Sequence, residues 1–384
     1  MSGKTSIEWT DRVWNPVAGC SKVSEGCRNC YAERMDRRFN AEWCEWKSPN
    51  AKQNVRLHSD RLDQPIRWRK PQRIFVNSVL DLFHEQVPDD YIDQVFGIML
   101  ACEYFENCHH TFQILTKRPE RMRNYLTSTT PSELLQRWAR SVEYTVHLDD
   151  GDVLLSEAVE GFCSSLWDEA GRSLTPDDKP WSHPENMFPL KSVWLGVSVE
   201  NQQAAEERIP LLLQTPASVR FLSMEPLLGK VSFTKLAIIE CPTCDDDKRW
   251  TNNPRPFVCH HCGNEQRVVS KIDWVVAGGE SGPNARPMHP DWARSIRNQC
   301  VAVGVPFFFK SWGEWESMPN QPWEVEPKGN CQIINLEGGS GFHGAGAMWT
   351  KRVGKKKAGR MLDGRIWNEI PYVGQPELDV KGSC

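Results

Sequence analysis

Ser192–Leu213 reads SVWLGVSVENQQAAEERIPLLL, and this stretch indicates the fold class. Its first part, Ser192–Val199, is an almost continuous apolar run, which is typical of a strand buried on both faces of a parallel sheet. Polar residues follow, and Asn201 is a good N-cap for a helix that continues to Leu213. A buried strand that leads at once into a helix is the repeating unit of α/β folds.

The same strand-then-helix unit recurs along the chain. The further runs expected to form parallel strands are Ser6–Trp9, Arg73–Ser78, Thr111–Leu115, Ser218–Ser223, Ile272–Ala277 and Val305–Phe309. Helices are expected at Asp89–Phe105, Pro119–Leu126 and Pro290–Val303, the last one ending before Gly304. These units predict an α/β fold, namely a partial TIM-like (β/α) barrel of about six or seven parallel strands. An open doubly wound sheet is the alternative, because strand order cannot be read from these patterns.

Two inserted segments interrupt this rhythm, and with a C-terminal extension they divide the chain into six parts. Residues 1–126 are expected to form the first part of the barrel, residues 191–232 its continuation and residues 271–315 its end. Residues 127–190 read as a mixed, acidic insertion, and residues 233–270 as a second insertion that contains cysteines. Residues 316–384 are expected to be a C-terminal extension with a basic run at Lys351–Arg360 (KRVGKKKAGR).

The composition is that of an ordinary globular protein, with 25% charged and 39% hydrophobic residues among 384. A net charge of −4 argues against capture of nucleic acid by the whole surface, although it leaves room for a local basic groove. Neither a run of about 18 apolar residues nor a signal peptide is found, which predicts a cytoplasmic protein. The 14 cysteines are therefore expected to be reduced thiols and metal ligands.

Three cysteines lie in Asn15–Arg38, NPVAGCSKVSEGCRNCYAERMDRR, with the spacing C-x6-C-x2-C. Cys20 and Cys27 are in a loop, and Cys30 precedes an expected helix at Tyr31–Phe39. Thiolates suit zinc or iron–sulfur clusters, and three cysteines would leave one iron of a four-iron cluster open to another ligand. The alternative is a structural zinc that is completed by a fourth ligand, Cys44 or His58.

A second cluster, Cys241, Cys244, Cys259 and Cys262, has the C-x2-C…C-x2-C spacing of a zinc ribbon. Four thiolates complete a tetrahedral zinc, so this site is expected to be closed and structural. An iron site of the rubredoxin kind is the minor alternative.

Polar side chains follow every predicted strand, at the rim where functional groups of parallel α/β folds collect. Lys117, Glu225 and Lys310 are the catalytic candidates, because amines and carboxylates can move protons. The candidates for binding a cofactor are Ser78, Asp81, Ser198, Glu200, Glu225, Gly278, Gly279, Glu280 and Trp312. Salt bridges that close the rim are the structural alternative for each charged residue.

Several motifs resemble a known family. They are WNPVAGCSKVSEGCRNCYAERM, NSVLDLF, ILTKRP, LGVSVEN, SMEPL, AGGESGPNARPMHPDWAR, FFFKSWGEW and KKAGRMLDG, and they span residues 1–126, 191–232 and 271–365. As a set they resemble a family of phage-associated three-cysteine-motif proteins that is similar to radical S-adenosylmethionine (SAM) enzymes.

The resemblance implies a 4Fe–4S cluster held by Cys20, Cys27 and Cys30, with SAM bound through its amino and carboxylate groups to the open iron. Reductive cleavage of SAM would then give a 5′-deoxyadenosyl radical. Six residues separate Cys20 from Cys27, whereas the commonest radical SAM spacing, C-x3-C-x2-C, has three at this point. A Gly-Gly-Glu segment usually meets the SAM amino group after the second strand; here Asp81 would stand in for it, and that role is not transferred to Gly278–Glu280.

Three functional hypotheses follow. The first is a radical SAM enzyme that modifies a nucleic-acid base or nucleotide, which the 17 tryptophans and the basic run also favour. Its partners would be DNA, RNA or a nucleotide and an electron donor, inside a bacterial cell as a phage, prophage or bacterial protein. The second is a non-catalytic, zinc-stabilised protein that binds nucleic acid or a partner. The third, ranked lowest, is a hydrolase or transferase that uses Glu200, Glu225 and Lys310.

Overall fold

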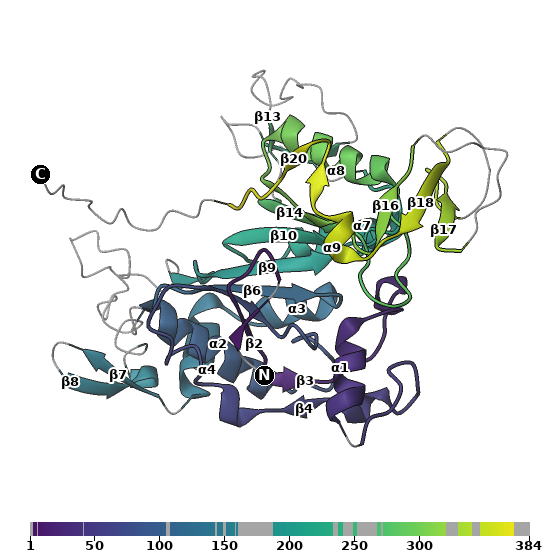
Figure 1. Ribbon diagram of the computed structural model, residues 1–384. Helices are drawn as coiled ribbons and strands as arrows, with labels where there is room; N and C mark the ends of the chain where they lie inside the picture. Colours follow the sequence, from purple (N-terminus) through teal and green to yellow (C-terminus); the bar gives the residue numbers. More distant parts are fainter. Residues whose placement is uncertain are drawn as a thin grey trace, which may run out of the picture.

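The computed structural model of the chain is an α/β half-barrel with small antiparallel sheets attached to it (Figure 1). It describes residues 3–5, 7–40, 42–104, 108–142, 144–148, 151–157, 159, 187–232, 237–240, 249–251, 267–269, 272–319, 329–339 and 346–371. No helix in these ranges has the length and apolar character that crossing a membrane requires.

Seven parallel strands form the half-barrel, and they are arranged in the order in which the chain makes them. They are β2 (Arg12–Trp14), β5 (Arg73–Val76), β6 (Thr111–Thr116), β9 (Val193–Ser198), β10 (Val219–Met224), β14 (Trp274–Gly278) and β15 (Phe307–Ser311). The short β1 (Gly3–Lys4) is antiparallel to β2 at one edge. Because the strand order never reverses, the predicted partial barrel is confirmed and the doubly wound alternative is wrong.

One predicted strand is wrong. Residues Ile7–Thr10 form a turn closed by a hydrogen bond from the Thr10 amide to the Ile7 carbonyl, and the first parallel strand is Arg12–Trp14. Trp9 nevertheless belongs to the barrel interior, where its ring packs 4.8 Å from that of Phe75. The apolar letters of Ser6–Trp9 therefore reflect a side chain that fills the barrel and not a strand.

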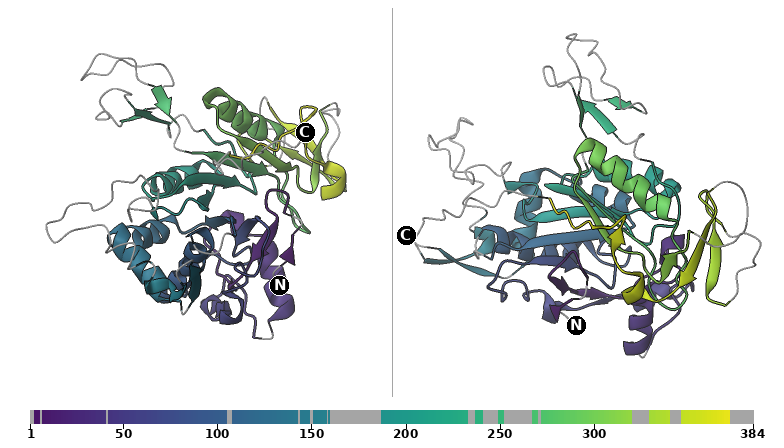
Figure 2. Two further views of the ribbon diagram at one scale, coloured as in Figure 1. Left: turned by 90° about the vertical axis from the view of Figure 1, so that its left-hand side faces the viewer. Right: turned by 45° about the horizontal axis from the view of Figure 1, so that its top comes forward.

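Helices cover the outer face of the sheet (Figure 2). They are α2 (Asp89–Tyr104), α3 (Pro119–Leu126), α4 (Pro131–Arg140), α7 (Gln202–Leu213) and α8 (Pro290–Val303), and most were expected from their end signals. The Asn201 side chain accepts a hydrogen bond from the Ala204 amide at 2.9 Å, and Gly304 ends α8 with φ 71°.

Helix α4 comes from the segment that reads as an insertion, yet it packs into this helix layer. The Trp138 ring of α4 stacks on Phe96 of α2 at 4.6 Å, and its indole N–H donates to the Tyr125 hydroxyl of α3 at 2.9 Å. Arg137 of α4 also forms an ion pair with Asp93 of α2 at 2.9 Å. The first part of residues 127–190 thus supports the barrel.

The concave face of the sheet carries a layer of aromatic rings. Alternate residues of a strand point to one face, and the inward ones are Phe75, Trp194, Phe221, Trp274 and Phe308. Gly196 makes room for this layer, because a Cβ there would lie 2.5 Å from the ring of Phe221. The rings close the bottom of the half-barrel and leave its mouth, at the carboxyl ends of the strands, for polar groups.

Smaller elements complete the chain. The C-terminal part forms a sheet of β16 (Trp315–Ser317), β18 (Met348–Arg352) and β17 (Cys331–Ile334), then α9 (Lys355–Ala358) and the hairpin β19 (Met361–Leu362) and β20 (Arg365–Ile366). An antiparallel bridge between Phe308 and Asn368 covers the free edge of β15. Near the N-terminus lie β3 (Val17–Ala18), paired with β4 (Arg56–Leu57), α1 (Tyr31–Phe39) and three short 3₁₀ turns at Glu25–Cys27, Ala51–Asn54 and Ser59–Arg61.

The two segments outside the barrel are described only in part. Strands β7 (Thr145–Leu148) and β8 (Gly151–Leu154) form a hairpin. Strands β12 (Arg249–Thr251), β11 (Ala237–Glu240) and β13 (Arg267–Val269) form an antiparallel sheet. The four cysteines predicted to bind zinc, Cys241, Cys244, Cys259 and Cys262, lie outside the described residues.

Candidate functional site

A cavity of about 540 Å³ lies at the mouth of the half-barrel, between the carboxyl ends of the strands and the cysteine loop. Cys20, Cys27 and Cys30 all line it. The other predicted site residues that line it are Ser78, Asp81, Lys117, Ser198, Glu225, Glu280 and Lys310. Most of the residues predicted from the sequence pattern therefore lie around one cavity, although they are far apart along the chain.

Among the described residues that line the cavity there is no fourth cysteine and no histidine. The Cys44 thiol donates instead to the Asn50 carbonyl at 3.0 Å, and His58 lines a neighbouring groove. Within the described part of the chain, no three Cys, His, Asp or Glu side chains form a ready-made metal site. Among the described residues that line the cavity, the three thiols are therefore the only sulfur ligands, and the other acidic groups are Asp81, Glu225 and Glu280.

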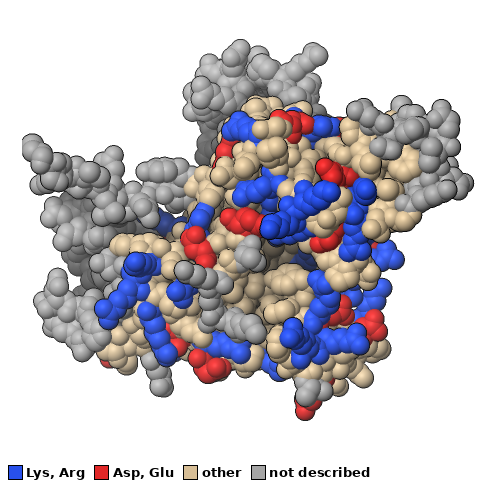
Figure 3. Space-filling view, in the orientation of Figure 1, with Lys and Arg blue, Asp and Glu red and all other residues tan. Residues whose placement is uncertain are grey.

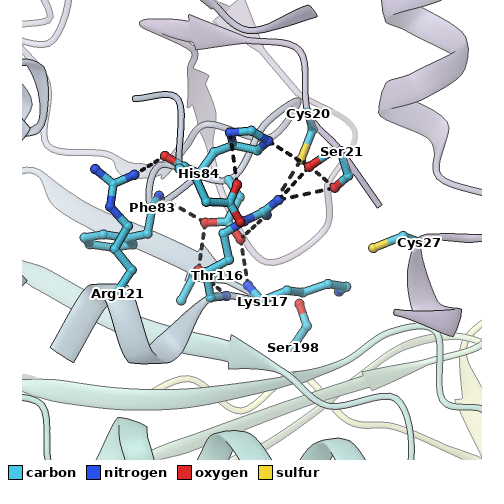
Figure 4. A network of polar contacts seen from close by, with 12 residues as sticks. Cys20, Ser21, Cys27, Phe83, His84, Thr116, Lys117, Arg121 and Ser198 are labelled. Atoms are coloured by element: carbon cyan, nitrogen blue, oxygen red, sulfur yellow. Dashed lines mark hydrogen bonds and ion pairs between the residues drawn. The ribbon is translucent and has the colours of Figure 1, made fainter. Parts of the chain in front are cut away.

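Cys20 lies against a buried ionic network (Figure 4). The Arg118 guanidinium is 3.9 Å from the Cys20 sulfur, and it also donates to the Ser21 hydroxyl at 3.0 Å. Burial raises the pKa of the Cys20 thiol to about 12, while the charge of Arg118 opposes this rise. A metal bound here must therefore displace a proton from the thiol, and the adjacent guanidinium would offset the negative charge that results.

Asp81 holds Arg118 in this position. Its carboxylate accepts hydrogen bonds from the Thr116 hydroxyl at 2.7 Å, from the Lys117 amide at 2.8 Å and from Arg118 at 3.2 Å. Both partners of the Asp81–Arg118 ion pair have only 8% of their side-chain surface exposed. Asp81 lines the cavity, but these contacts use its oxygens to fix the strand end that carries Lys117 and Arg118.

Cys27 reaches the cavity from the loop, and Cys30 from the start of α1. Burial raises the pKa of the Cys30 thiol, and the first amides of α1 oppose this rise. Cys27 lies 3.8 Å from the Ser24 hydroxyl. Figure 4 shows Cys27 facing the same open space as Lys117 and Ser198, which come from the ends of β6 and β9.

The opposite wall carries the other catalytic candidates. The Lys310 ammonium donates to both oxygens of Glu225, at 2.6 and 2.8 Å, and both residues line the cavity. By contrast, the Lys117 ammonium makes no hydrogen bond or ion pair with any described residue. The site thus contains one neutralised charge pair, through which a proton can move, and one amine without a hydrogen-bond partner among the described residues, whose charge acts on Glu200 and Cys30.

Glu280 fastens the cysteine loop to the barrel. Its carboxylate accepts from the Asn29 side chain at 3.1 Å and from Arg286 at 2.7 and 2.9 Å, and Arg286 also pairs with Glu25 at 3.2 Å. Asn29 and Glu25 lie within the cysteine loop, whereas Glu280 and Arg286 follow β14. These four residues, Glu25, Asn29, Glu280 and Arg286, form a loop clamp that fixes the positions of Cys27 and Cys30.

Glu200 does not line the cavity, but its carboxylate lies against Gly26 of the cysteine loop. It forms a buried ion pair with Arg208 at 2.8 Å, and a Cβ at Gly26 would lie 3.1 Å from its carboxylate. Burial alone would raise the pKa of Glu200, but Lys117 and Arg208 together hold it below its ordinary value. Glu200 therefore stays charged beneath the loop.

Gly278, Gly279 and Trp312 also lie outside the cavity lining. A Cβ at Gly278 would lie 3.3 Å from the Lys310 Cβ, and one at Gly279 would overlap the Trp312 carbonyl. The Trp312 indole donates to the Met361 carbonyl at 2.8 Å. The two glycines let the end of β14 approach the segment after β15, and no ligand role for these three residues follows from their position.

Sequence reasoning missed many of the residues that line the cavity, and four of them are polar groups with a clear position. Arg118 directly follows Lys117 in the motif ILTKRP, and Arg34 lies one helical turn after Cys30, so both positions carried a signal. Tyr31 donates to the Ser78 carbonyl at 2.5 Å. Asn77 has a left-handed backbone (φ 57°), and its side-chain amide nitrogen is buried with no partner among the described residues. Neither the hydrogen bond of Tyr31 nor the backbone conformation of Asn77 can be predicted from a local sequence pattern.

Searches of curated proteins and of solved structures found no match. A family model does match residues 4–371, which include the half-barrel, the cysteine loop and the C-terminal sheet. The chain therefore belongs to the family described as Protein of unknown function (DUF5131).

Proposed function

We propose that this chain is a radical-SAM-type iron–sulfur enzyme whose 4Fe–4S cluster is held by Cys20, Cys27 and Cys30. The observation that carries the proposal is that these three thiols line one cavity at the mouth of a parallel half-barrel, with no fourth cysteine and no histidine among the described lining residues. Three soft ligands without a fourth suit an open cluster better than a closed structural zinc. The resemblance of the motifs supports the same assignment.

When bound, the cluster would supply one electron, taken from a low-potential donor, that breaks the C5′–S bond of SAM to give methionine and a 5′-deoxyadenosyl radical able to take a hydrogen atom from the substrate. Around it the chain's own residues have simpler tasks. Arg118 offsets thiolate charge at Cys20, and the ammonium of Lys117, which lines the cavity, can bind a carboxylate. Ser78, Asp81 and Ser198 are the proposed neighbours of SAM.

Lys310 and Glu225 are the proposed proton carriers. Their atoms are 2.6 Å apart, so a proton can pass from the ammonium to the carboxylate or to a substrate group placed beside either one. Both side chains are largely buried, at 14% and 19% exposure, which limits exchange with bulk water. The pair thus suits the final protonation of a substrate inside the cavity.

A nucleic-acid base or a nucleotide is the proposed substrate. The cavity walls include the exposed ring of Tyr31, on which a planar base can stack, and the buried rings of Trp9 and Phe75 form an apolar floor. Cationic side chains outnumber carboxylates in the lining, which favours an anionic substrate: Arg34, Lys117, Arg118, Lys310 and Lys355 against Asp81, Glu225 and Glu280. The motif resemblance supports a phage or prophage origin and a location in the bacterial cytoplasm, where thiols stay reduced.

The test is anaerobic reconstitution with iron and sulfide, followed by reduction in the presence of SAM. We expect about four irons per cluster and release of 5′-deoxyadenosine. Cys27→Ser should lose both, whereas Cys44→Ser should keep both, because Cys44 does not line the cavity. A wild-type protein with full iron content that leaves SAM intact would refute the proposal.

One observation favours a second function, a zinc-stabilised protein that binds nucleic acid or a partner without catalysis. The described parts of residues 233–270 form a three-stranded antiparallel sheet, as a zinc ribbon would. In that case the cavity cysteines would bind zinc as well. Colourless protein that retains two zinc ions per chain after anaerobic purification, and no iron after reconstitution, would favour this function.

A further inference from the structure

Helix α1, directly after Cys30, turns both of its carboxylates toward the protein. Glu33 pairs with Lys22 at 2.6 Å, and Asp36 pairs with Arg56 at 2.6 Å and accepts from the Trp46 indole at 3.1 Å. Neither acid therefore contributes negative charge to the outer face of the helix.

The exposed residues of α1 are only arginines and large apolar side chains. Tyr31, Met35 and Phe39, spaced four residues apart, lie along one line of the helix and are 46%, 37% and 59% exposed. Arg34, Arg37 and Arg38 are exposed beside them. Figure 3 shows Lys and Arg gathered at the lower right of this face, where α1 lies in Figure 1.

The apolar line of α1 forms one wall of a groove of about 770 Å³. The opposite side of the groove is lined by Arg56, His58 and Arg61, and the one carboxylate among its described lining residues, Asp36, is paired with Arg56. Arg34, Arg37 and Arg38 flank the groove on the exposed face of α1. The groove adjoins the cysteine cavity, because Ile7, Tyr31, Ala32, Ser78 and Val79 line both. The Tyr31 hydroxyl is fixed on the Ser78 carbonyl, which leaves the ring face between groove and cavity.

We propose that this groove binds single-stranded nucleic acid and leads one unpaired base past Tyr31 into the cysteine cavity. Aromatic side chains that stack on bases, interleaved with arginines that contact phosphates, are what single-strand binding requires. A base held in a duplex could not enter, because its pairing edge and its ring faces are already covered. The delivery of a base for reaction depends on the function proposed above, whereas strand binding itself does not.

The other occupants fit the groove less well. A second copy of the chain would place the arginines of α1 against those of its partner, which repel. A protein partner would need acidic side chains along the whole groove, and it would give no reason for aromatic rings beside the cavity mouth. A strand offers a phosphate and a base at each step, and α1 presents Arg34 and Arg38 one turn apart, beside the line of Met35 and Phe39 that forms the groove wall.

The test measures fluorescence anisotropy of labelled 20-nucleotide strands, both DNA and RNA, with the reconstituted 384-residue chain and no SAM. Phe39→Ala should weaken binding about fivefold or more, the effect of losing one stacked base. Arg38→Gln should lower the slope of log Kd against log salt by about one phosphate contact. Arg140→Gln is the matched control, because Arg140 is exposed on α4 at the outer helix layer. Melting curves show that each variant is folded.

Several results would overturn the proposal. They are no binding of either single strand, equal binding of the duplex, an equal effect of Arg140→Gln, or displacement of the strand by polyglutamate as effectively as by unlabelled strand, which would indicate an acidic protein partner. Because the measurement uses neither SAM nor reductant, failure of SAM cleavage with intact strand binding would reject only the enzymatic proposal.

Discussion

Acid should destabilise the fold through one histidine beside the cysteine loop. The His84 side chain has no exposed surface, and its Nδ1 accepts from the Gln86 amide at 3.1 Å. The proton must therefore be on Nε2, which donates to the Ser21 hydroxyl at 2.8 Å. Burial lowers the pKa of His84 to about 4, and the nearby Arg118 acts in the same direction.

The sign follows from the two states of the chain. The unfolded histidine has the ordinary pKa of 6.5, so between pH 6.5 and pH 4 the unfolded chain binds a proton that the folded chain does not. The stability due to this residue is fully present above pH 6.5 and is lost as the pH falls. The loss amounts to about 2 kcal/mol between pH 7 and pH 5 and about 3 kcal/mol once complete.

The assay is chemical denaturation at pH 7 and pH 5 for the wild type and for His84→Asn, whose side-chain oxygen can still accept from the Gln86 amide. The variant should lose about 2 kcal/mol less free energy of unfolding over this interval than the wild type. His109→Asn is the matched control at an exposed histidine. If His84→Asn and the wild type differ by less than about 0.5 kcal/mol, His84 ionises freely in the folded protein and the reasoning fails.

Three further predictions concern the barrel and the cavity. Gly196→Ala should lower the free energy of unfolding by about 1–3 kcal/mol, because the added Cβ would lie 2.5 Å from the Phe221 ring. Gly229→Ala is the control and should be neutral, because its nearest neighbour is 3.6 Å away. Equal effects of the two substitutions would contradict the packing of the barrel interior. Arg118→Met should cost about 3–5 kcal/mol in denaturation experiments, because it leaves Asp81 charged and buried, and a loss below about 1 kcal/mol would mean that the pair is solvated. Lys117→Met should weaken SAM binding to reconstituted protein by about tenfold or more in calorimetry; unchanged affinity would show that its ammonium faces no ligand group.

The barrel could be predicted because its signals are local. Continuous apolar runs gave six of the seven parallel strands, and Pro119–Leu126 and Pro290–Val303 were predicted with their observed bounds from proline and the residues that follow. The first strand failed for a physical reason. Arg12–Trp14 is too short to carry a pattern, whereas Trp9 is apolar because of a tertiary contact with Phe75.

The cavity was predicted only to the extent that strand ends determine it. Lys117, Glu225 and Lys310 meet there because parallel strands end at one edge. The partner of each charge depends on side-chain reach in three dimensions, so the ion pairs that use Glu200 and Glu280 could not be read from the chain. The same limit applies to the exposure of α1, because the inward contacts of its two acids involve residues from other segments.

The loop clamp sets an order of events during synthesis. Asn29 and Glu280 are 251 residues apart in the chain, and Arg286 lies further still. While a ribosome is making the protein, the cysteine loop emerges early and has no Glu280 to hold it until most of the chain has appeared. Its three thiols are then exposed to oxidants and to stray metal ions. If the proposed cluster is bound here, its loading is a late, post-translational step, and chains that end before Arg286 should be unable to complete it.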